Sequence, residues 1–302
     1  MYNILLPMKK IDALQLGGTL FVPATHKHLE AIAHGSKFTA LRSVVLDTED
    51  GIGESELADG LESIKALLPT LKSGPLLRFI RPRNPEVLER LLQFEGINSI
   101  DGFIFPKFGL DSAQEYLSAI KRPEPGIRHF FMPSIEGREL FDASQLRKLR
   151  DLLLPYRAYI PAIRFGAEDM LRQLGLRREC ELSLYDMAAP CSVIGNLLGV
   201  FKPYGFDLAA PVYGCYRDHT GFIREAKRDL QEGLVSKTII HPDQIDLMEQ
   251  AYAVDTLQYE AAKEIVASKN AVFGQSGKMA ERATQHPWAM MIMERAKTYG
   301  TF

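Results

Sequence analysis

The sequence predicts an α/β fold, a closed (β/α)8 TIM barrel with additional C-terminal helices, on three observations. Eight short β-rich runs alternate with segments of helical periodicity, the pattern of βαβ units and a parallel sheet. Several of the runs are almost continuously apolar, as expected for strands that are covered on both faces. Charged residues follow the runs directly, and enzymes of this architecture keep their chemistry at the carboxyl ends of the strands.

The predicted strands share a short apolar core that ends at a turn or at charged residues. They cover residues 18–23, 43–49, 75–81, 102–107, 129–136, 160–166, 206–214 and 237–242. The helical patterns between them lie at 28–35, 56–72, 86–96, 113–122, 143–156, 187–205 and 221–234. An open doubly wound sheet is the alternative. It requires a Gly-rich turn after the first strand, whereas Gly17 and Gly18 lie at or before its start.

The chain continues beyond the last predicted strand in a different pattern. Helical periodicity runs through 243–254 and 256–270, a turn is expected at 273–278, and a last helix is expected at 286–300. These segments have too few apolar positions for an independent domain. We therefore predict a catalytic barrel over residues 1–254 and a helical extension over 255–302 that packs on the barrel or on a neighbouring subunit.

Composition narrows the class of protein. The 302 residues are 46% hydrophobic and 25% charged, with a net charge of -2, so no strong field favours nucleic acid or an anionic membrane. No apolar run reaches membrane-spanning length. Cys180, Cys191 and Cys215 lack CxxC spacing, which favours free thiols and a reducing compartment. The first 16 residues lack a signal-peptide pattern, and a cytoplasmic protein is expected.

Two carboxylates carry the strongest functional signal. Glu136 and Asp169 follow the fifth and sixth predicted strands, which are neighbours about 5 Å apart in a parallel barrel. Two anions at that distance repel each other unless a cation lies between them. Hard oxygen ligands with room for water and substrate suit Mg²⁺, so we predict a magnesium site. The alternative for Asp169 alone is that it caps the following helix.

Charged residues also follow the second and third strands. Arg78 and Arg81 point to opposite sides of the third strand, and we expect Arg78 to face the pocket and clamp an acidic substrate. Asp47, Glu49 and Asp50 form an acidic cluster that is expected to orient a metal-bound water and the arginine. At least one of the three has a simpler interpretation as a turn residue before glycine.

Other rim residues leave alternatives open. Lys107 follows the fourth strand and raises the possibility of a Schiff base, although nearby carboxylates favour its protonated form. His26 lies in a small basic patch after the first strand that suits a phosphate or nucleotide tail, or is a solvated helix start. His241 is interpreted as structural, and the role of Asp218 is left open. Cys215 is expected to be inert.

The ordered motifs resemble those of the citrate lyase β-subunit-like branch of the HpcH/HpaI aldolase family. They are FVPATHKHLEAIAHG, SVVLDTEDGI, LLRFI, GFIFPK, SIEG, FGAEDML, KTIIHPDQI and SGKM, and they extend from residue 18 to about residue 296. The resemblance implies a homotrimeric TIM barrel that cleaves or forms carbon–carbon bonds with Mg²⁺ held by Glu136 and Asp169. It also implies that Arg78 engages a substrate carboxylate and that the substrate is a CoA or carrier-protein thioester.

Two motifs depart from the family pattern. The family reads P-G-N-R after the first strand, where this chain has Pro23 to His26, so the loss of the arginine puts CoA recognition in doubt. The family pattern R-x-N in the third strand has Ile80 in place of its asparagine. The substrate-binding residues expected from the resemblance are therefore Arg78, Lys107, Pro23 and His26.

The functional hypothesis is a Mg²⁺-dependent carbon–carbon bond lyase acting on a small oxo or hydroxy acid, either free or as a citryl- or malyl-like thioester. Cleavage would follow retro-aldol or retro-Claisen chemistry, with Arg78, Asp47, Glu49 and Asp50 as the catalytic group. Two alternatives remain at this point. One is a Schiff-base aldolase that uses Lys107, and the other is a barrel that has lost catalysis and serves in binding or assembly.

Overall fold

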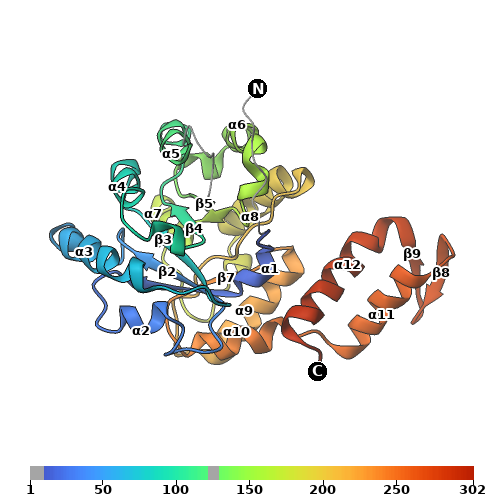
Figure 1. Ribbon diagram of the computed structural model, residues 1–302. Helices are drawn as coiled ribbons and strands as arrows, with labels where there is room; N and C mark the ends of the chain where they lie inside the picture. Colours follow the sequence, from blue (N-terminus) through green and yellow to red (C-terminus); the bar gives the residue numbers. More distant parts are fainter. Residues whose placement is uncertain (1–9, 122–128) are drawn as a thin grey trace.

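The computed structural model describes residues 10–121 and 129–302, and its centre is a seven-stranded parallel sheet (Figure 1). The strand order is β6-β5-β4-β3-β2-β1-β7. The strands are β1 (Gly18–Pro23), β2 (Ser43–Asp47), β3 (Leu77–Arg81), β4 (Gly102–Phe105), β5 (Phe130–Ile135), β6 (Arg164–Phe165) and β7 (Lys237–Ile239). Seven of the eight predicted strands are therefore confirmed, although β6 is short.

The remaining predicted strand, 206–214, does not form a regular strand. Leu208 forms a single parallel bridge with Ile163, just before β6, and Ala210 forms another with Lys237 in β7. This segment therefore contacts both edges of the sheet without a continuous ladder. Pro211 follows directly and has no N–H to donate, which limits the pairing there.

Side chains of the sheet alternate between two buried layers. In β2, Val45 belongs to an inner core, whereas Val44 and Leu46 belong to the larger core under the helices. The inner core also receives Leu16 from the short helix that precedes β1. This alternation decides which strand-end side chains face the inside of the curled sheet.

Ten helices are associated with the sheet in the described part of the chain. They are α1 (Ala13–Leu16), α2 (Leu29–Ala33), α3 (Leu57–Leu67), α4 (Pro85–Leu91), α5 (Ala113–Ile120), α6 (Ala143–Leu153), α7 (Ala167–Gln173), α8 (Ala188–Phe201), α9 (His219–Glu232) and α10 (Gln244–Tyr252). Short 3-10 helices cover Glu54–Glu56, Leu68–Thr70, Ile97–Ser99, Arg138–Phe141, Leu154–Tyr159, Leu184–Asp186 and Lys202–Tyr204. Asn84 and Asp142 cap α4 and α6 with their side chains, which fixes where these helices begin. The predicted end of α5 at residue 122, and residues 1–9 of the N-terminal segment, lie outside the described residues.

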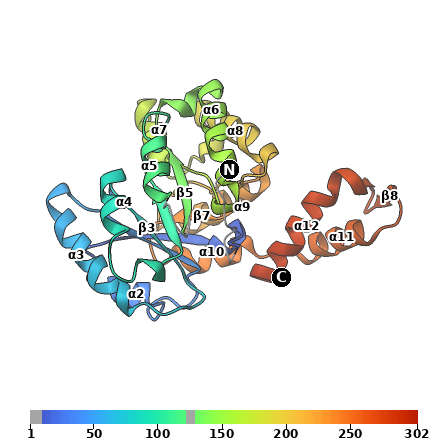
Figure 2. The ribbon, with the colours of Figure 1, turned by 45° about the horizontal axis from the view of Figure 1, so that its top comes forward.

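Residues 255–302 form an arm that projects away from the sheet in both views (Figures 1 and 2). It consists of α11 (Thr256–Ala267), β8 (Val272–Gln275), β9 (Lys278–Glu281) and α12 (Arg282–Tyr299). The two strands pair antiparallel, so the segment expected to be only a turn is a hairpin. Ser276 and Gly277 both have positive φ, which the tight connection requires. The last helix consequently begins at Arg282, before the predicted position.

The base of the arm is anchored on the sheet-forming part of the chain. The hydroxyl of Tyr299 donates to the Leu14 carbonyl at 2.6 Å. Arg42 donates to the Thr298 carbonyl at 2.8 Å and forms an ion pair with Glu249 at 2.6 Å. Leu14 lies in α1, directly before β1, so the anchor is at the amino ends of the strands.

Within the described residues, no helix combines the length and the apolar character needed to cross a membrane.

Candidate active site

Asp47 and Arg81 form the centre of the candidate site. The last residues of β2 and β3 lie opposite each other in register, and both side chains point inward. Arg81 Nε and Nη2 donate to the two Asp47 carboxylate oxygens, each at 2.6 Å. The amides of Glu49 and Gly51 donate to the same oxygens at 3.0 and 2.9 Å. The carboxylate of Asp47 is thus saturated with donors, which suits a role in orienting Arg81.

Arg78 does not face this site, so the expectation that it lines the pocket is wrong. Its Nε donates at 2.6 Å to the carbonyl of Ala33, at the end of α2, on the outer side of the sheet. Arg78 and Arg81 are an odd number of residues apart in one strand, so they point to opposite faces. The prediction that the two side chains point to opposite faces of the strand is correct, but the one that reaches the carboxylates is Arg81.

Glu49 connects Arg81 to Lys107. The carboxylate of Glu49 is 3% exposed, accepts from Arg81 Nη1 at 2.9 Å and pairs with the ammonium group of Lys107. Asp50 is more exposed and lies 3.4 Å from the same ammonium. Burial raises the pKa of Glu49, and the charge of Arg81 opposes that rise. The structure therefore brings Asp47, Glu49 and Asp50 together around two cations.

Lys107 also reaches the metal-ligand candidates through its backbone. Its φ of 48° lies in the left-handed region, which is uncommon for a residue with a side chain. In this conformation its amide donates to Glu136 Oε2 at 3.2 Å, while its ammonium turns toward Glu49. Burial alone would lower the pKa of Lys107, but the hydrogen bond and charge of Glu49 raise it. Lys107 is thus held as a cation.

Glu136 and Asp169 converge over Gly166. A Cβ on Gly166 would lie 2.7 Å from Glu136 Cγ and 3.1 Å from Asp169 Oδ2. Glu136 follows β5, while Gly166 and Asp169 belong to the start of α7 after the adjacent strand β6. Burial raises the pKa of Glu136 to about 7, and the negative charge of Asp169 adds to the effect. The matched strand ends that the sequence predicted do bring the two carboxylates together.

The pair has the properties of a divalent-cation site. Mg²⁺ is commonly held by one or two carboxylates and completes its shell with water and substrate oxygens. The missing side chain at Gly166 lets both carboxylates approach its backbone, and the pKa of Glu136 is raised by burial and by the negative charge of Asp169, which a cation would compensate. Within the described ranges no group of three or more His, Cys, Asp or Glu residues has the arrangement of a metal cage. The fit is therefore to an ion with two protein ligands.

The remaining predicted rim residues make other contacts. Pro23 ends β1 opposite Asp47, which places it at the edge of the site. His26 Nδ1 accepts a hydrogen bond from the His28 amide at 3.1 Å, a contact within the loop that follows β1. Asp218 caps α9 through the Gly221 amide at 2.9 Å, which supports a structural role. The structural interpretation of His241 stays a prediction.

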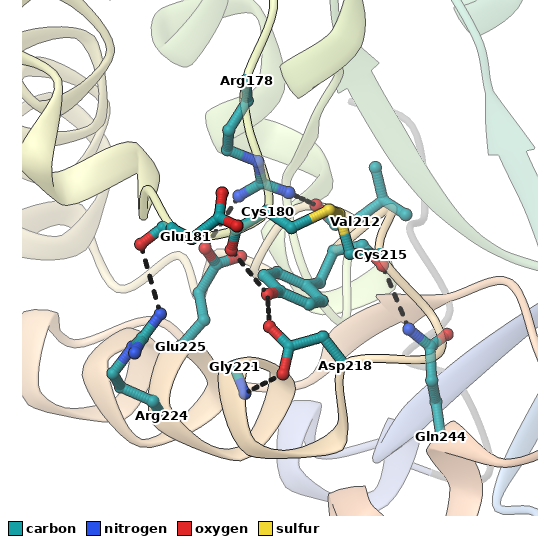
Figure 3. The surroundings of a disulfide bond; sticks show 11 residues. Arg178, Cys180, Glu181, Val212, Cys215, Asp218, Gly221, Arg224, Glu225 and Gln244 are labelled. Carbon is teal, nitrogen blue, oxygen red and sulfur yellow. Dashed lines mark hydrogen bonds and ion pairs between the residues drawn. A yellow bond between two sulfur atoms is a disulfide. The ribbon is translucent and has the colours of Figure 1, made fainter.

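Cys180 and Cys215 form a disulfide, so the expectation of three free thiols is wrong for this pair (Figure 3). Their Cα atoms are 5.8 Å apart, within the range that a disulfide can bridge. The distance between the two cysteines in the chain conceals this contact, because it arises only when the loop after α7 meets the loop before α9. Cys191 is a free, half-buried thiol. The cysteine argument for a reducing compartment therefore fails.

The two loops are also joined by polar contacts around the disulfide (Figure 3). Arg178 donates to the Val212 carbonyl at 3.1 Å and forms a buried ion pair with Glu225 at 2.7 Å. The Tyr213 hydroxyl lies 2.9 Å from the Cys180 carbonyl. The first of these loops follows α7, the helix that carries Asp169, so the disulfide ties the segment after this helix to the loop before α9.

We expect Cys180→Ser to lower the free energy of unfolding by about 3–4 kcal/mol, because the bond closes a loop with a sequence separation of 35. Urea unfolding with and without a thiol reductant measures this difference. Cys191→Ser is the matched control and should change stability much less. A melting curve of the unmodified protein that does not respond to the reductant contradicts the prediction.

Two arginines near the site were not selected from the sequence. Side chains alternate between the two faces of a strand, so Asp47 and Arg81 face inward like Val45 and Phe79, two residues before them. This alternation could have identified Arg81. Arg164 in β6 lies inside the sheet and is 3% exposed. It occupies an inward position in a run that otherwise reads as apolar, and a charged residue at such a position is the signal that could have indicated it.

The family model described as C–C bond lyase of the TIM-barrel fold matches residues 10–301. The chain belongs to this family. It is therefore a carbon–carbon lyase, and the resemblance to citrate lyase β-subunit-like proteins is confirmed.

Curated relatives cover most of the chain at low identity. A (3S)-malyl-CoA thioesterase from Cereibacter sphaeroides is 20% identical over 82% of this chain and 81% of its own. The mitochondrial citramalyl-CoA lyase of Homo sapiens is 24% identical over 74% of this chain and 68% of its own. The citrate lyase subunit beta of Escherichia coli is 29% identical over 46% of each chain.

Solved structures agree on the fold. A citrate lyase from Burkholderia xenovorans superimposes with a TM-score of 0.75 at 18% identity, covering 95% of this chain and 93% of the other. CitE from Mycobacterium tuberculosis, in complex with magnesium, acetoacetate and coenzyme A, has a TM-score of 0.67 at 22% identity, covering 94% and 100%. At this identity the likeness concerns the fold alone.

Proposed function

We propose that this protein is a Mg²⁺-dependent lyase that cleaves or forms a carbon–carbon bond in a small oxo or hydroxy acid. The observation that carries the proposal is the convergence of Glu136 and Asp169 over Gly166. This pair lies at the carboxyl ends of β5 and β6, beside the cationic Arg81 and Lys107. The proposal also takes segment 208–210, which bridges both edges of the sheet, as the eighth strand position of a closed (β/α)8 barrel.

Glu136 and Asp169 would hold the ion, and Gly166 would leave space for it. When bound, the ion supplies Lewis-acid polarisation of a substrate carbonyl or hydroxyl oxygen next to a carboxylate. The backbone amide of Lys107 fixes the Glu136 carboxylate through its hydrogen bond to Oε2. Gln173, the last residue of α7, donates to the Glu136 carbonyl at 2.8 Å, which holds this helix against the end of β5.

Arg81 supplies positive charge to the substrate side of the site. Asp47 and Glu49 engage its Nε and one N–H of each terminal nitrogen, so the guanidinium is rigid. A fixed cation of this kind stabilises negative charge that develops on a substrate oxygen as the bond breaks, without reorganisation at that moment. The ammonium of Lys107 adds a second cation on the same side.

The substrate is proposed to be a thioester of coenzyme A or of a carrier protein. The names of the relatives support this, because they act on malyl-CoA and citramalyl-CoA. Pro23 and His26 would lie along the path of the carrier group. The exchange of the family arginine for His26 means that contacts to the carrier differ from those expected in the family.

Asp169→Ala is expected to abolish Mg²⁺-dependent turnover of citramalyl-CoA or malyl-CoA while the protein stays folded. The reason is that a single remaining carboxylate cannot grip the ion. Initial rates are measured across a Mg²⁺ titration, and circular dichroism checks the fold. Arg172→Ala is the matched control, because it removes the exposed ion pair at 2.8 Å from Asp169 but leaves the carboxylate. Activity that persists in excess chelator refutes the metal requirement.

The two alternative functions receive less support. A Schiff base needs a neutral lysine, whereas the hydrogen bond and charge of Glu49 raise the pKa of Lys107 and keep it protonated. Trapping of a keto acid on Lys107 with borohydride would revive this alternative. A barrel without catalysis is disfavoured by the family and by the intact carboxylate pair.

A homotrimer stays a proposal, and the arm is the segment proposed to pack on a neighbouring subunit. Large apolar side chains of the arm are exposed to solvent in the single chain, including Leu257 at 80%, Met279 at 68% and Phe302 at 67%. Exposed apolar groups of this kind mark association surfaces when they are contiguous. Light scattering of the purified protein measures the mass. A cytoplasmic location also stays a prediction.

A further inference from the structure

Arg164 crosses the inside of the sheet beneath the candidate site. Its Nη2 donates to Thr19 Oγ1 in β1 at 2.6 Å, and its Nη1 donates to Thr238 Oγ1 in β7 at 3.0 Å. The guanidinium carbon lies 5.7 Å from the centre of the Phe21 ring. The side chain therefore starts in β6 and ends between β7 and β1, where its guanidinium donates to two threonine hydroxyls.

The charge of Arg164 has no anionic partner among the residues that the structure describes. No carboxylate in these ranges forms an ion pair with it, and its Nε is buried without a hydrogen-bond acceptor. Burial, together with the nearby positive charge of Arg81, lowers the pKa of Arg164 to about 9. A buried charge without a counter-charge opposes folding. Its presence here is explained if an anion enters the site from outside the chain.

Arg164 lies one layer below the carboxylate pair. It is opposite Ser134 in the β5–β6 register, two residues before the level of Glu136. Two residues along a strand span about 6.6 Å, so the backbone of Arg164 lies about that far below the level of Glu136, and its guanidinium reaches across the inside of the sheet to β7 and β1. The guanidinium carbon of Arg81 lies 5.1 Å from the centre of the same Phe21 ring, so both arginines contact this side chain. Phe21 and Thr238 at this level are half-buried, whereas Arg164 itself is 3% exposed.

We propose that Arg164 binds a second carboxylate of the substrate, so that the site selects an oxo or hydroxy diacid over a monoacid. This rests on the proposed function, because the first carboxylate is taken to lie at the Glu136–Asp169 pair. The carboxylates of Asp47 and Glu49 already balance the charge of Arg81. Arg164 has a buried Nε without a hydrogen-bond partner and no carboxylate partner among the described residues, so it is the cation that a carboxylate would complete.

Malate and lactate are the probes that test this assignment. Both are stable 2-hydroxy acids with the same metal-chelating end, and only malate carries a second carboxylate. Isothermal titration of the full chain in Mg²⁺ should show malate binding roughly 10- to 100-fold more tightly than lactate, the effect of a hydrogen bond to a charged group. Equal affinities, or no binding of malate, overturn the proposal.

Arg164→Met removes the charge and keeps a long apolar side chain. It should abolish the preference for malate while leaving lactate binding unchanged, and thermal unfolding should show that the variant is folded, because replacing a buried unpaired charge by an apolar group is often neutral or stabilising. Arg164→Lys should retain part of the preference. If Arg164 only ties the strands together, both acids lose affinity to the same extent, and the proposal fails.

These titrations are independent of turnover. A preference for malate that depends on Arg164, in a protein that cleaves no thioester, would uphold the carboxylate subsite and reject the proposed lyase substrate. Cleavage of a thioester with no dependence of acid binding on Arg164 would do the reverse.

Discussion

Asp47→Ala is expected to lower the free energy of unfolding by about 3–5 kcal/mol, the effect of removing one partner of a buried ion pair. The Asp47 side chain is 3% exposed and that of Arg81 is 13% exposed. Without Asp47, Arg81 keeps its charge in a buried position and loses two of its hydrogen bonds, while two backbone amides of the 47–51 turn lose their acceptor. Urea unfolding followed by circular dichroism measures the change.

Asp50→Ala is the control for this prediction. Asp50 belongs to the same acidic cluster and lies near the same cations, but its side chain is 61% exposed. Its removal should change stability by less than about 0.5 kcal/mol, as for most surface substitutions. If the two variants are equally stable, Asp47 does not hold Arg81 in the way that the geometry indicates.

Gly166→Ala is expected to reduce Mg²⁺-dependent turnover by roughly 100-fold, the scale of the loss when catalytic groups are displaced by about 1 Å. The added methyl group would lie 2.7 Å from Glu136 Cγ and 3.1 Å from Asp169 Oδ2, so at least one carboxylate must move. Gly166 has a φ of -85°, which alanine adopts freely, so backbone strain does not contribute. Steady-state kinetics and Mg²⁺ titration calorimetry measure the two consequences.

Gly195→Ala serves as the matched control. Gly195 lies in α8, and nothing lies within 4 Å of the position that a Cβ would take. The variant should keep full activity and gain about 0.5–1 kcal/mol of stability from the better helix propensity of alanine. Full activity in Gly166→Ala would show that the two carboxylates do not need the space above this glycine.

The alternation of strands and helices could be predicted because each strand carries its own local signal. Apolar runs such as 102–105 and 130–135 are bounded by turns and charges, and the structure confirms both as strands. Segment 206–214 carries a similar signal but forms only single bridges. Its pairing depends on the positions of both sheet edges, which no local pattern records.

The carboxylate pair was accessible to the same reasoning, whereas the arginine was not. Neighbouring parallel strands end on one face, so Glu136 and Asp169 could be placed together from their positions at matched strand ends. Choosing between Arg78 and Arg81 required knowing which residues of β3 face the inside of the sheet. That is set by the register with β2 and by the packing of Arg78 against the end of α2. A one-residue error in parity reverses the face of every side chain in a strand.

The sequence by itself determined the order of the elements, the family and the two acidic groups at the strand ends, because these depend on patterns within short segments. Only the tertiary structure decided that Arg81 completes the site, that Cys180 joins Cys215, and that Arg164 lies inside the sheet without a counter-charge among the residues described. Each of these depends on contacts between residues that are distant in the chain, and the free energy of such contacts is set by packing and burial that exist only in the folded protein.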